Sequence, residues 1–233
     1  MYNEIVDAAA LPFASVSRYA HQFVRGKLRH DPVFRALLQK GLLPDQGQLL
    51  DLGCGLGVLP ALLHEAKNHY HAGNWSTDWP PPPQNLYVHG VELLEWKVAA
   101  ANKALGTKAA IQRGDIRSFA LPPCTAVIIL DVLLYLRTTE QQQTLQRIFQ
   151  VMQPGGILLL REANADGGWR FHITRLSEQI LSLWRGQGWP SLRYRSTAEW
   201  IALLEELGFC VESMPMSQGT PFANVLFRAT RIT

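Results

Sequence analysis

The stretch LLDLGCGLG, residues 49–57, holds the residues near the start of the chain that are most suited to ligand chemistry. Apolar residues lead into Asp51, and glycines follow at Gly53, Gly55 and Gly57. Glycine lets the backbone approach a ligand closely because it has no Cβ. A helix that starts after such a turn also offers unpaired N–H groups to an anion. The pattern predicts a strand that ends in a nucleotide-binding turn, which by itself fits NAD, FAD, ATP or S-adenosylmethionine.

The spacing of the glycines argues against two of these ligands. The dinucleotide fingerprint is G-x-G-x-x-G, and here the third glycine, Gly57, comes one residue early. None of the six tyrosines has a lysine four positions later, so the Tyr-x-x-x-Lys pair of short-chain dehydrogenases is absent from the sequence. The phosphate-binding run G-x-x-x-x-G-K-[ST] is also absent, which excludes a P-loop.

Composition limits the class of protein. The chain has 233 residues, of which 47% are hydrophobic, and its net charge is +3. This length and hydrophobic content fit one globular α/β domain with an added segment. The net charge is too small to indicate nucleic-acid binding. We expect no membrane span and no secretory signal, since no apolar run approaches about 20 residues and no basic region precedes the first one. Three widely spaced cysteines are typical of free thiols in a reducing cytoplasm, where we place the protein.

The hydrophobic pattern predicts a helical segment over residues 1–44 and an alternating α/β domain over residues 45–233. Asp31-Pro32 is typical of a helix start within the first segment. Strands are expected at residues 48–53, 86–92, 109–114, 125–131 and 156–163, and helices at residues 58–66, 93–105, 139–152 and 196–208. Strands this apolar on both faces indicate a doubly wound parallel sheet. Two closing strands, 209–216 and 223–230, have hairpin spacing, so the last one should be antiparallel.

One long loop, residues 67–85, interrupts the alternation. It joins a helix to the next strand, so it should lie at the edge opposite the ligand-binding carboxyl ends of the strands. We interpret it as a structural insert or an oligomer contact. His64, His69 and His71 lie beside it, but HEAKN is not the HExxH pattern, so we expect no metal site.

Four stretches in order resemble the motifs of class I S-adenosylmethionine-dependent methyltransferases. LLDLGCGLG is similar to their first motif, and VHGVEL places Glu92 at the end of the second strand. Glu92 follows Gly53 by 92 − 53 = 39 positions, and subtracting the nineteen-residue insert leaves the usual spacing of about 20. RGDIRSF and LDVLLYL match the next two motifs, and QPGGILLL resembles the fifth strand. The resemblance implies a Rossmann-like seven-stranded sheet of order 3-2-1-4-5-7-6, with the N-terminal helices acting as a lid.

This resemblance implies S-adenosylmethionine as cofactor and S-adenosylhomocysteine as product. Asp51 would face the positively charged half of the cofactor. Glu92 would accept both ribose hydroxyls, and Leu93 would cover one face of the adenine. The full expected cofactor set is Asp51, Gly53, Gly55, Gly57, Glu92, Leu93, Asp115, Ile116 and Asp131.

Candidates for the acceptor side follow the later strands and the N-terminal segment. Tyr135 comes after the fourth strand, at a position where related small-molecule enzymes often place an active-site residue. Arg161 and Glu162 end the fifth strand, and His172 follows in a segment that often forms a pocket wall. Histidine can act as a general base near neutral pH. We expect Tyr135, His172 and Arg161 as catalytic candidates and Tyr19, His21 and Glu162 as substrate contacts.

The nature of the acceptor is the least determined property. Amino-group methylases of nucleic acids carry [DN]PP[YFW] where this chain has DVLLY, and Cys124 of LPPC precedes the fourth strand at the wrong edge. A small aromatic or lipid-like molecule fits better, and the C-terminal half has similarity to enzymes of bacterial pigment and aryl-polyene pathways. Arginine-rich segments at 18–35 and 161–195 suit an anionic acceptor or an acidic acyl carrier protein that presents the substrate. A non-catalytic cofactor- or partner-binding module and an RNA methyltransferase stay open as alternatives.

Overall fold

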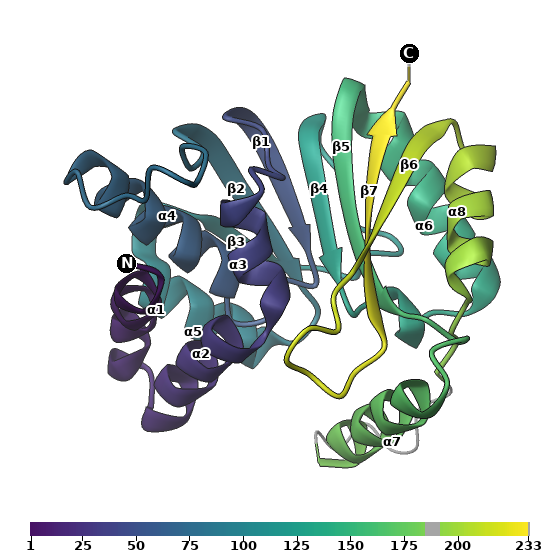
Figure 1. Ribbon diagram of the computed structural model, residues 1–233, viewed down its shortest axis with the longest axis horizontal. Helices are drawn as coiled ribbons and strands as arrows, with labels where there is room; N and C mark the ends of the chain where they lie inside the picture. The colour runs from purple at the N-terminus through teal and green to yellow at the C-terminus, as the bar shows by residue number, and fades with distance from the viewer. Residues whose placement is uncertain (185–191, 233) are drawn as a thin grey trace. The chain divides into compact units, whose positions relative to one another are not determined.

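The computed structural model (Figure 1) describes residues 1–184 and 192–232. The chain forms two compact units, residues 1–128 and residues 129–233. Each unit is treated by itself below. The fourth strand, β4 (Cys124–Leu130), contains the point where the first unit passes into the second. The boundary at residue 44 expected from the sequence stays a prediction.

The first unit begins with helices α1 (Tyr2–Ala10), η1 (Leu11–Ser15), α2 (Arg18–His30) and α3 (Pro32–Gln39). Helix α2 begins at Arg18, because the Ser17 hydroxyl accepts the Ala20 N–H and caps the helix there. Asp31 caps α3 by accepting the Val33 N–H at 3.2 Å, with Pro32 in the first helical position as the sequence indicated.

Three parallel strands carry the rest of this unit. Strand β1 (Gln46–Leu52) pairs with β2 (Asn85–Glu92), which pairs with β3 (Ala110–Arg113). Helices α4 (Val58–His71) and α5 (Glu95–Leu105) and the short η2 (Gly106–Lys108) connect them. The register places Asp51 opposite Gly90, so the carboxyl ends of β1 and β2 lie side by side.

The insert begins later than residue 67, because α4 continues to His71 and Gly73 follows at φ 73°. Lys67 to His71 contain no helix breaker, which explains the longer helix. Beyond it, Trp79 lies against the Tyr2 ring at 6.0 Å between centroids, and the Arg35 guanidinium lies over both rings. The insert therefore packs on the N-terminal helices.

The second unit contains η3 (Leu133–Tyr135), α6 (Thr138–Val151), β5 (Met152–Ala163), α7 (Trp169–Trp184), α8 (Thr197–Glu206), β6 (Phe209–Pro215) and β7 (Asn224–Arg231). Ser196 and Glu199 form a capping box at the start of α8. Strand β7 runs antiparallel to both β5 and β6, which confirms the expected closing hairpin. Trp200 and Phe227 are among the largest fully buried side chains of this unit.

The seven strands follow the order β3-β2-β1-β4-β5-β7-β6, which confirms the α/β fold and the strand order that the resemblance implied. Within the described residues, no helix has the length and apolar character needed to cross a membrane.

Candidate cofactor and acceptor sites

The glycine turn after β1 is held by hydrogen bonds to the neighbouring strand. The N–H groups of Gly53 and Cys54 both donate to the Val91 carbonyl, at 2.8 and 3.2 Å. Gly53, Gly55 and Gly57 all have positive φ, between 59° and 82°, a region that favours glycine. The turn therefore depends on glycine at each of these positions.

The space around the turn differs between Gly55 and Gly57. A Cβ built on Gly57 would lie 2.5 Å from Leu105 Cδ1, whereas a Cβ on Gly55 would meet nothing within 4 Å. Gly57 is also the N-cap of α4, and no side chain caps that helix. Open space in front of Gly55 and an uncapped helix N-terminus are what a bound anionic group needs.

Glu92 ends β2 and reaches back to this turn. One carboxylate oxygen, Oε2, accepts the Gly55 N–H at 3.0 Å, and the other, Oε1, accepts the Leu94 N–H at 2.9 Å. The side chain is buried, so its orientation is fixed by these backbone groups. A carboxylate oxygen has two acceptor positions, which leaves each oxygen able to accept one further hydroxyl.

Asp51 brings a second buried carboxyl to the same place. It ends β1 and is buried like Glu92. Burial, and then the charge of Glu92, raise the pKa of Asp51 to about 7. Burial and these two carboxylates also raise the pKa of the Cys54 thiol, which makes Cys54 a poor nucleophile. The two buried carboxyls thus favour a cationic group near them, whereas the N-terminus of α4 favours an anionic one.

The remaining cofactor candidates of the first unit follow β2 and β3. Leu93 is exposed although it is apolar, and Ile116 is buried. Asp115 accepts the Arg117 N–H at 2.9 Å and forms an ion pair with its guanidinium. The hydrogen bond from Arg117 is the main cause that lowers the pKa of Asp115, so this carboxylate is charged at neutral pH.

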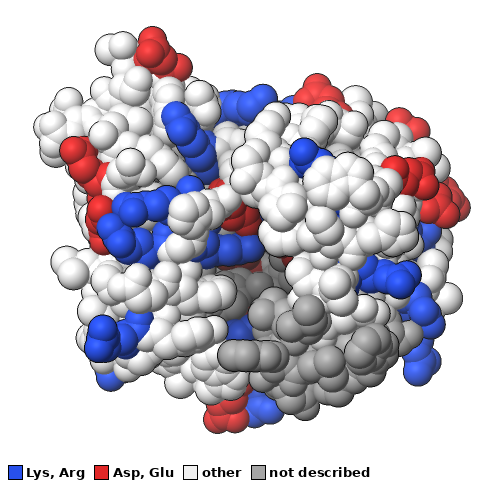
Figure 2. Space-filling model, turned by 60° about the horizontal axis from the view of Figure 1, so that its bottom comes forward, with Lys and Arg blue, Asp and Glu red and all other residues white. Residues whose placement is uncertain are grey.

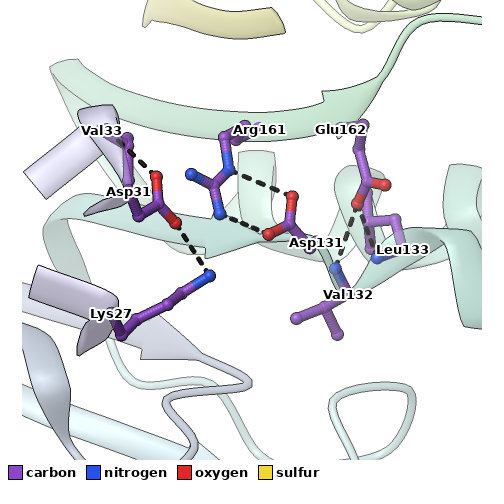
Figure 3. Close-up of polar contacts among 8 residues, drawn as sticks. All are labelled: Lys27, Asp31, Val33, Asp131, Val132, Leu133, Arg161 and Glu162. Atoms are coloured by element: carbon purple, nitrogen blue, oxygen red, sulfur yellow. Dashed lines mark hydrogen bonds and ion pairs between the residues drawn. The ribbon is translucent and has the colours of Figure 1, made fainter. Parts of the chain in front are cut away.

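Asp131, the last cofactor candidate, lies in the second unit and pairs with Arg161. Arg161 Nε donates to Asp131 Oδ1 at 3.0 Å, and Nη2 contacts Oδ2 (Figure 3). Arg161 is fully buried, and Asp131 has a positive φ of 58°, which is uncommon for a non-glycine residue. The bidentate ion pair with Arg161 helps to hold Asp131 in this left-handed backbone conformation, directly after β4.

Glu162 holds the turn that follows Asp131. Its Oε1 accepts the Val132 and Leu133 N–H groups at 3.2 and 2.8 Å (Figure 3). The pKa of Glu162 is raised well above its usual range, mainly by burial and then by the negative charge of Asp131. This turn leads into η3, which carries the half-buried Tyr135.

Sequence reasoning missed Gln141 of α6, which is also fully buried. Its amide donates to the carbonyls of Leu133 and Arg193, at 3.0 and 3.2 Å, and its oxygen accepts from Arg195 Nε at 2.9 Å. No motif marks this glutamine, because its partners lie in segments far apart in the sequence. It joins the turn before Tyr135 to the segment that precedes α8.

The structure places the other acceptor candidates on helices. Tyr19 and His21 lie on α2 in the first unit, and Tyr19 is exposed. His172 lies on α7 in the second unit and is exposed too. Tyr135, Arg161 and Glu162 therefore come together around one turn, and the three other candidates lie elsewhere in their units.

Residues 19–214 match the family model described as a methyltransferase domain. The chain belongs to the class I S-adenosylmethionine-dependent methyltransferases. The match covers the glycine turn, Glu92, Asp115 and the turn after β4, so it includes every site described above.

Solved structures of this fold include several methyltransferases. An O-methyltransferase family protein from Burkholderia thailandensis aligns with 95% of this chain and 62% of its own, at a TM-score of 0.67 and 16% identity. Magnesium protoporphyrin IX methyltransferase from Synechocystis PCC 6803, solved with S-adenosylhomocysteine, aligns over 92% and 88%, at a TM-score of 0.59 and 20% identity. At these identities the likeness establishes the fold.

Curated relatives in sequence include the carboxy-S-adenosyl-L-methionine synthase of Chromohalobacter salexigens, 29% identical over 117 residues. That alignment covers 48% of this chain and 38% of the relative. The corresponding synthase of an Escherichia coli O7:K1 strain is 30% identical over 49% of this chain and 43% of its own. The chain thus spans less than half the length of these relatives.

The first unit of this methyltransferase fits its cofactor chemically. Each Glu92 carboxylate oxygen accepts one backbone N–H, so each keeps the capacity to accept one ribose hydroxyl. The space in front of Gly55 is open, and the Asp51 carboxyl would supply negative charge for the cationic half of S-adenosylmethionine.

Proposed function

We propose that this methyltransferase transfers a methyl group from S-adenosylmethionine to a small, apolar acceptor. S-adenosylmethionine, when bound, supplies a methyl group activated by the positive charge on its sulfur. The observation that carries the proposal is the placement of Glu92, which is buried and fixed by Gly55 and Leu94 with acceptor capacity left on both oxygens. The rest of the reaction is then positioning of the acceptor.

Exposed apolar side chains in both units support an apolar acceptor. On α2, Tyr19 and Phe23 are exposed and stack on each other, with centroids 6.0 Å apart. On α7, Trp169, Ile173 and Leu176 are exposed, at spacings of four and three that place them on one face of a helix. Exposed apolar groups that gather in this way are typical of binding surfaces.

The acceptor-side residues divide into two roles in this proposal. Arg161 and Glu162 hold Asp131 and the turn before Tyr135, so we assign them to positioning. Tyr135 and His172 remain the candidates for contact with the acceptor and for proton removal, because a half-buried phenol and an exposed imidazole can both exchange protons.

The charges of the first unit favour a free acceptor over one bound to an acidic carrier protein. Arg25 and Arg29 pair with Asp7, and Lys27 pairs with Asp31 (the latter drawn in Figure 3). Basic side chains also lie next to acidic ones on the face drawn in Figure 2. Local pairing of this kind reduces the net field that would attract an acidic partner.

Calorimetry with S-adenosylmethionine tests the cofactor half of the proposal. We expect Glu92→Ala to lower affinity at least 100-fold, because two charge-assisted hydrogen bonds are lost. Glu95→Ala is the matched control, since Glu95 is exposed and pairs with Arg113. Equal affinities in Glu92→Ala and the unmodified chain would contradict the proposal. A screen of aromatic and lipid-like metabolites with labelled cofactor then identifies the acceptor.

A second candidate function follows from the named sequence relatives, which are carboxy-S-adenosyl-L-methionine synthases. In that case the reaction would modify the cofactor itself and would not methylate a separate acceptor. Mass spectrometry of the ligand released from purified protein separates the two. Unmodified S-adenosylmethionine supports methyl transfer, and a carboxylated form supports the second function.

A further inference from the structure

Three apolar side chains are exposed on two helices of the first unit that pack against each other, η1 and α2. Leu11 of η1 is 66% exposed, and Tyr19 and Phe23 of α2 are 67% and 38% exposed. Tyr19 and Phe23 are four positions apart, so they lie on the same side of the helix, where their rings stack. We call these three side chains the N-terminal patch. The opposite side of α2 is buried through Ala20, Val24 and Leu28.

The surplus positive charge of the whole chain lies in the same part of the sequence. Residues 1–44 contain six lysines and arginines and three acidic residues, a surplus of three. The whole chain has 22 against 19, so the remaining residues contain sixteen of each and are neutral on balance. Ion pairs do not cancel the surplus, because Arg25 and Arg29 share the single carboxylate of Asp7.

Arg18 places one of these positive charges next to the patch. It is exposed, directly precedes Tyr19 and lies in the first turn of α2. A positive charge in the first turn interacts unfavourably with the helix dipole, and within Arg18–His30 no acidic residue offsets it. The stability of α2 therefore does not favour arginine at this position, whereas an anionic partner does.

We propose that the N-terminal patch binds the surface of an anionic lipid bilayer. Exposed leucine and aromatic side chains next to arginine are typical of helices that lie in the headgroup region, where the apolar groups insert and the cations meet lipid phosphates. Tyrosine in particular suits this interface, because its ring is apolar and its hydroxyl is polar. A nucleic acid or an acidic protein uses the charge but leaves Leu11 and Phe23 without an apolar partner.

A bilayer also concentrates apolar molecules, so this surface brings the methyltransferase to an acceptor of the kind proposed above. The binding itself does not depend on the cofactor site. It needs no membrane-spanning helix, because only side chains of η1 and α2 enter the headgroup region.

The test is co-sedimentation of the full chain with phosphatidylcholine vesicles that contain or lack phosphatidylglycerol. The unmodified chain should bind the anionic vesicles more tightly, and added salt should weaken that binding. Replacing both rings of the patch (Tyr19→Ser with Phe23→Ser) should lower the partition coefficient about tenfold or more on both kinds of vesicle. Arg18→Gln should lower it about fivefold, on the anionic vesicles alone.

Two matched controls should bind as the unmodified chain does. Tyr87→Ser removes a tyrosine of β2 that is 56% exposed, and Lys103→Gln removes one positive charge at an exposed position of α5. Equal losses in Arg18→Gln and Lys103→Gln would show that net charge alone acts, and this would overturn the proposal. Absence of vesicle binding by the unmodified chain, or unchanged binding by the double variant, would overturn it too.

Binding to an RNA oligonucleotide or to polyglutamate separates the bilayer from other polyanions. If either binds as tightly as the anionic vesicles and the double variant keeps that affinity, the patch is not a lipid surface. Circular dichroism checks that each variant folds, and if the double variant does not, Tyr19→Ser alone should show a smaller loss in the same direction. All vesicle measurements are made without S-adenosylmethionine, so failure of the cofactor site appears separately, in the calorimetry of Glu92→Ala.

Discussion

The two units of the methyltransferase hold their candidate residues in different ways. In the first unit, Glu92 is fixed by backbone N–H groups and keeps acceptor capacity toward open space at Gly55. In the second, Arg161 and Glu162 bind Asp131 and the turn after it. The charged groups of the first unit thus keep acceptor capacity that a ligand could use, whereas those of the second unit fix a turn.

The largest expected effect concerns Asp51 and uses the stability of the ligand-free protein. The raised pKa of Asp51, about 7 against 3.8 for the unperturbed group, means that the folded state binds a proton which the unfolded state has lost. Stability should therefore fall as pH rises from about 4 to 7, by up to about 4 kcal/mol from this residue. When unfolding is measured in urea, Asp51→Asn should lack this part of the pH-dependent loss of stability. The control Asp78→Asn, at an exposed position, should keep it.

If Asp51→Asn and the unmodified chain lose equal stability between pH 4 and 7, Asp51 is not a buried, ligand-directed carboxyl. Glu162 also has a raised pKa and contributes in the same direction. The difference between the two proteins isolates Asp51.

Arg161→Met should have the next largest effect, because it leaves Asp131 without its buried partner. We expect a loss of about 3 kcal/mol in the free energy of unfolding, measured in urea. Arg228→Met is the matched control in the same unit, since the Arg228–Glu212 pair is partly exposed and 3.6 Å long. Exposed pairs contribute about 0–1 kcal/mol. A loss no larger than that of the control would break the contrast between the units.

The smallest expected effect on stability compares two glycines of the first unit. Gly55 and Gly73 both have positive φ, and a Cβ on either would meet nothing within 4 Å. Alanine at either position should cost about 1 kcal/mol through backbone strain. Only Gly55→Ala should also lower affinity for S-adenosylmethionine, by about tenfold or more, because its methyl group enters the proposed ligand space. Equal affinities in the two variants would place the ligand elsewhere.

The sequence predicted the first unit better than the second for a physical reason. The glycine turn and the acidic end of β2 are local patterns, and each residue type is required by its own backbone position, as Gly57 at the start of α4 shows. The strand order that the resemblance implied and the antiparallel β7 expected from hairpin spacing were also confirmed. Asp131 was expected at the cofactor from its motif alone, and its pairing with Arg161 had no local signal.

Other contacts could not be predicted because their partners are distant in the chain. Gln141 is joined to Leu133 and Arg195 by folding alone, and a glutamine within a helix gives no sign of this. The end of α4 was also placed too early, because His-rich and Asn-rich sequence favours a loop only weakly. The contact between Trp79 and Tyr2 likewise needed the structure.

A crystal structure of the methyltransferase with S-adenosylmethionine tests the central claim most directly. The account predicts both ribose hydroxyls within hydrogen-bond distance of the Glu92 carboxylate, with the ligand passing in front of Gly55. A ribose held by other residues, with Glu92 bonded only to Gly55 and Leu94, would contradict it.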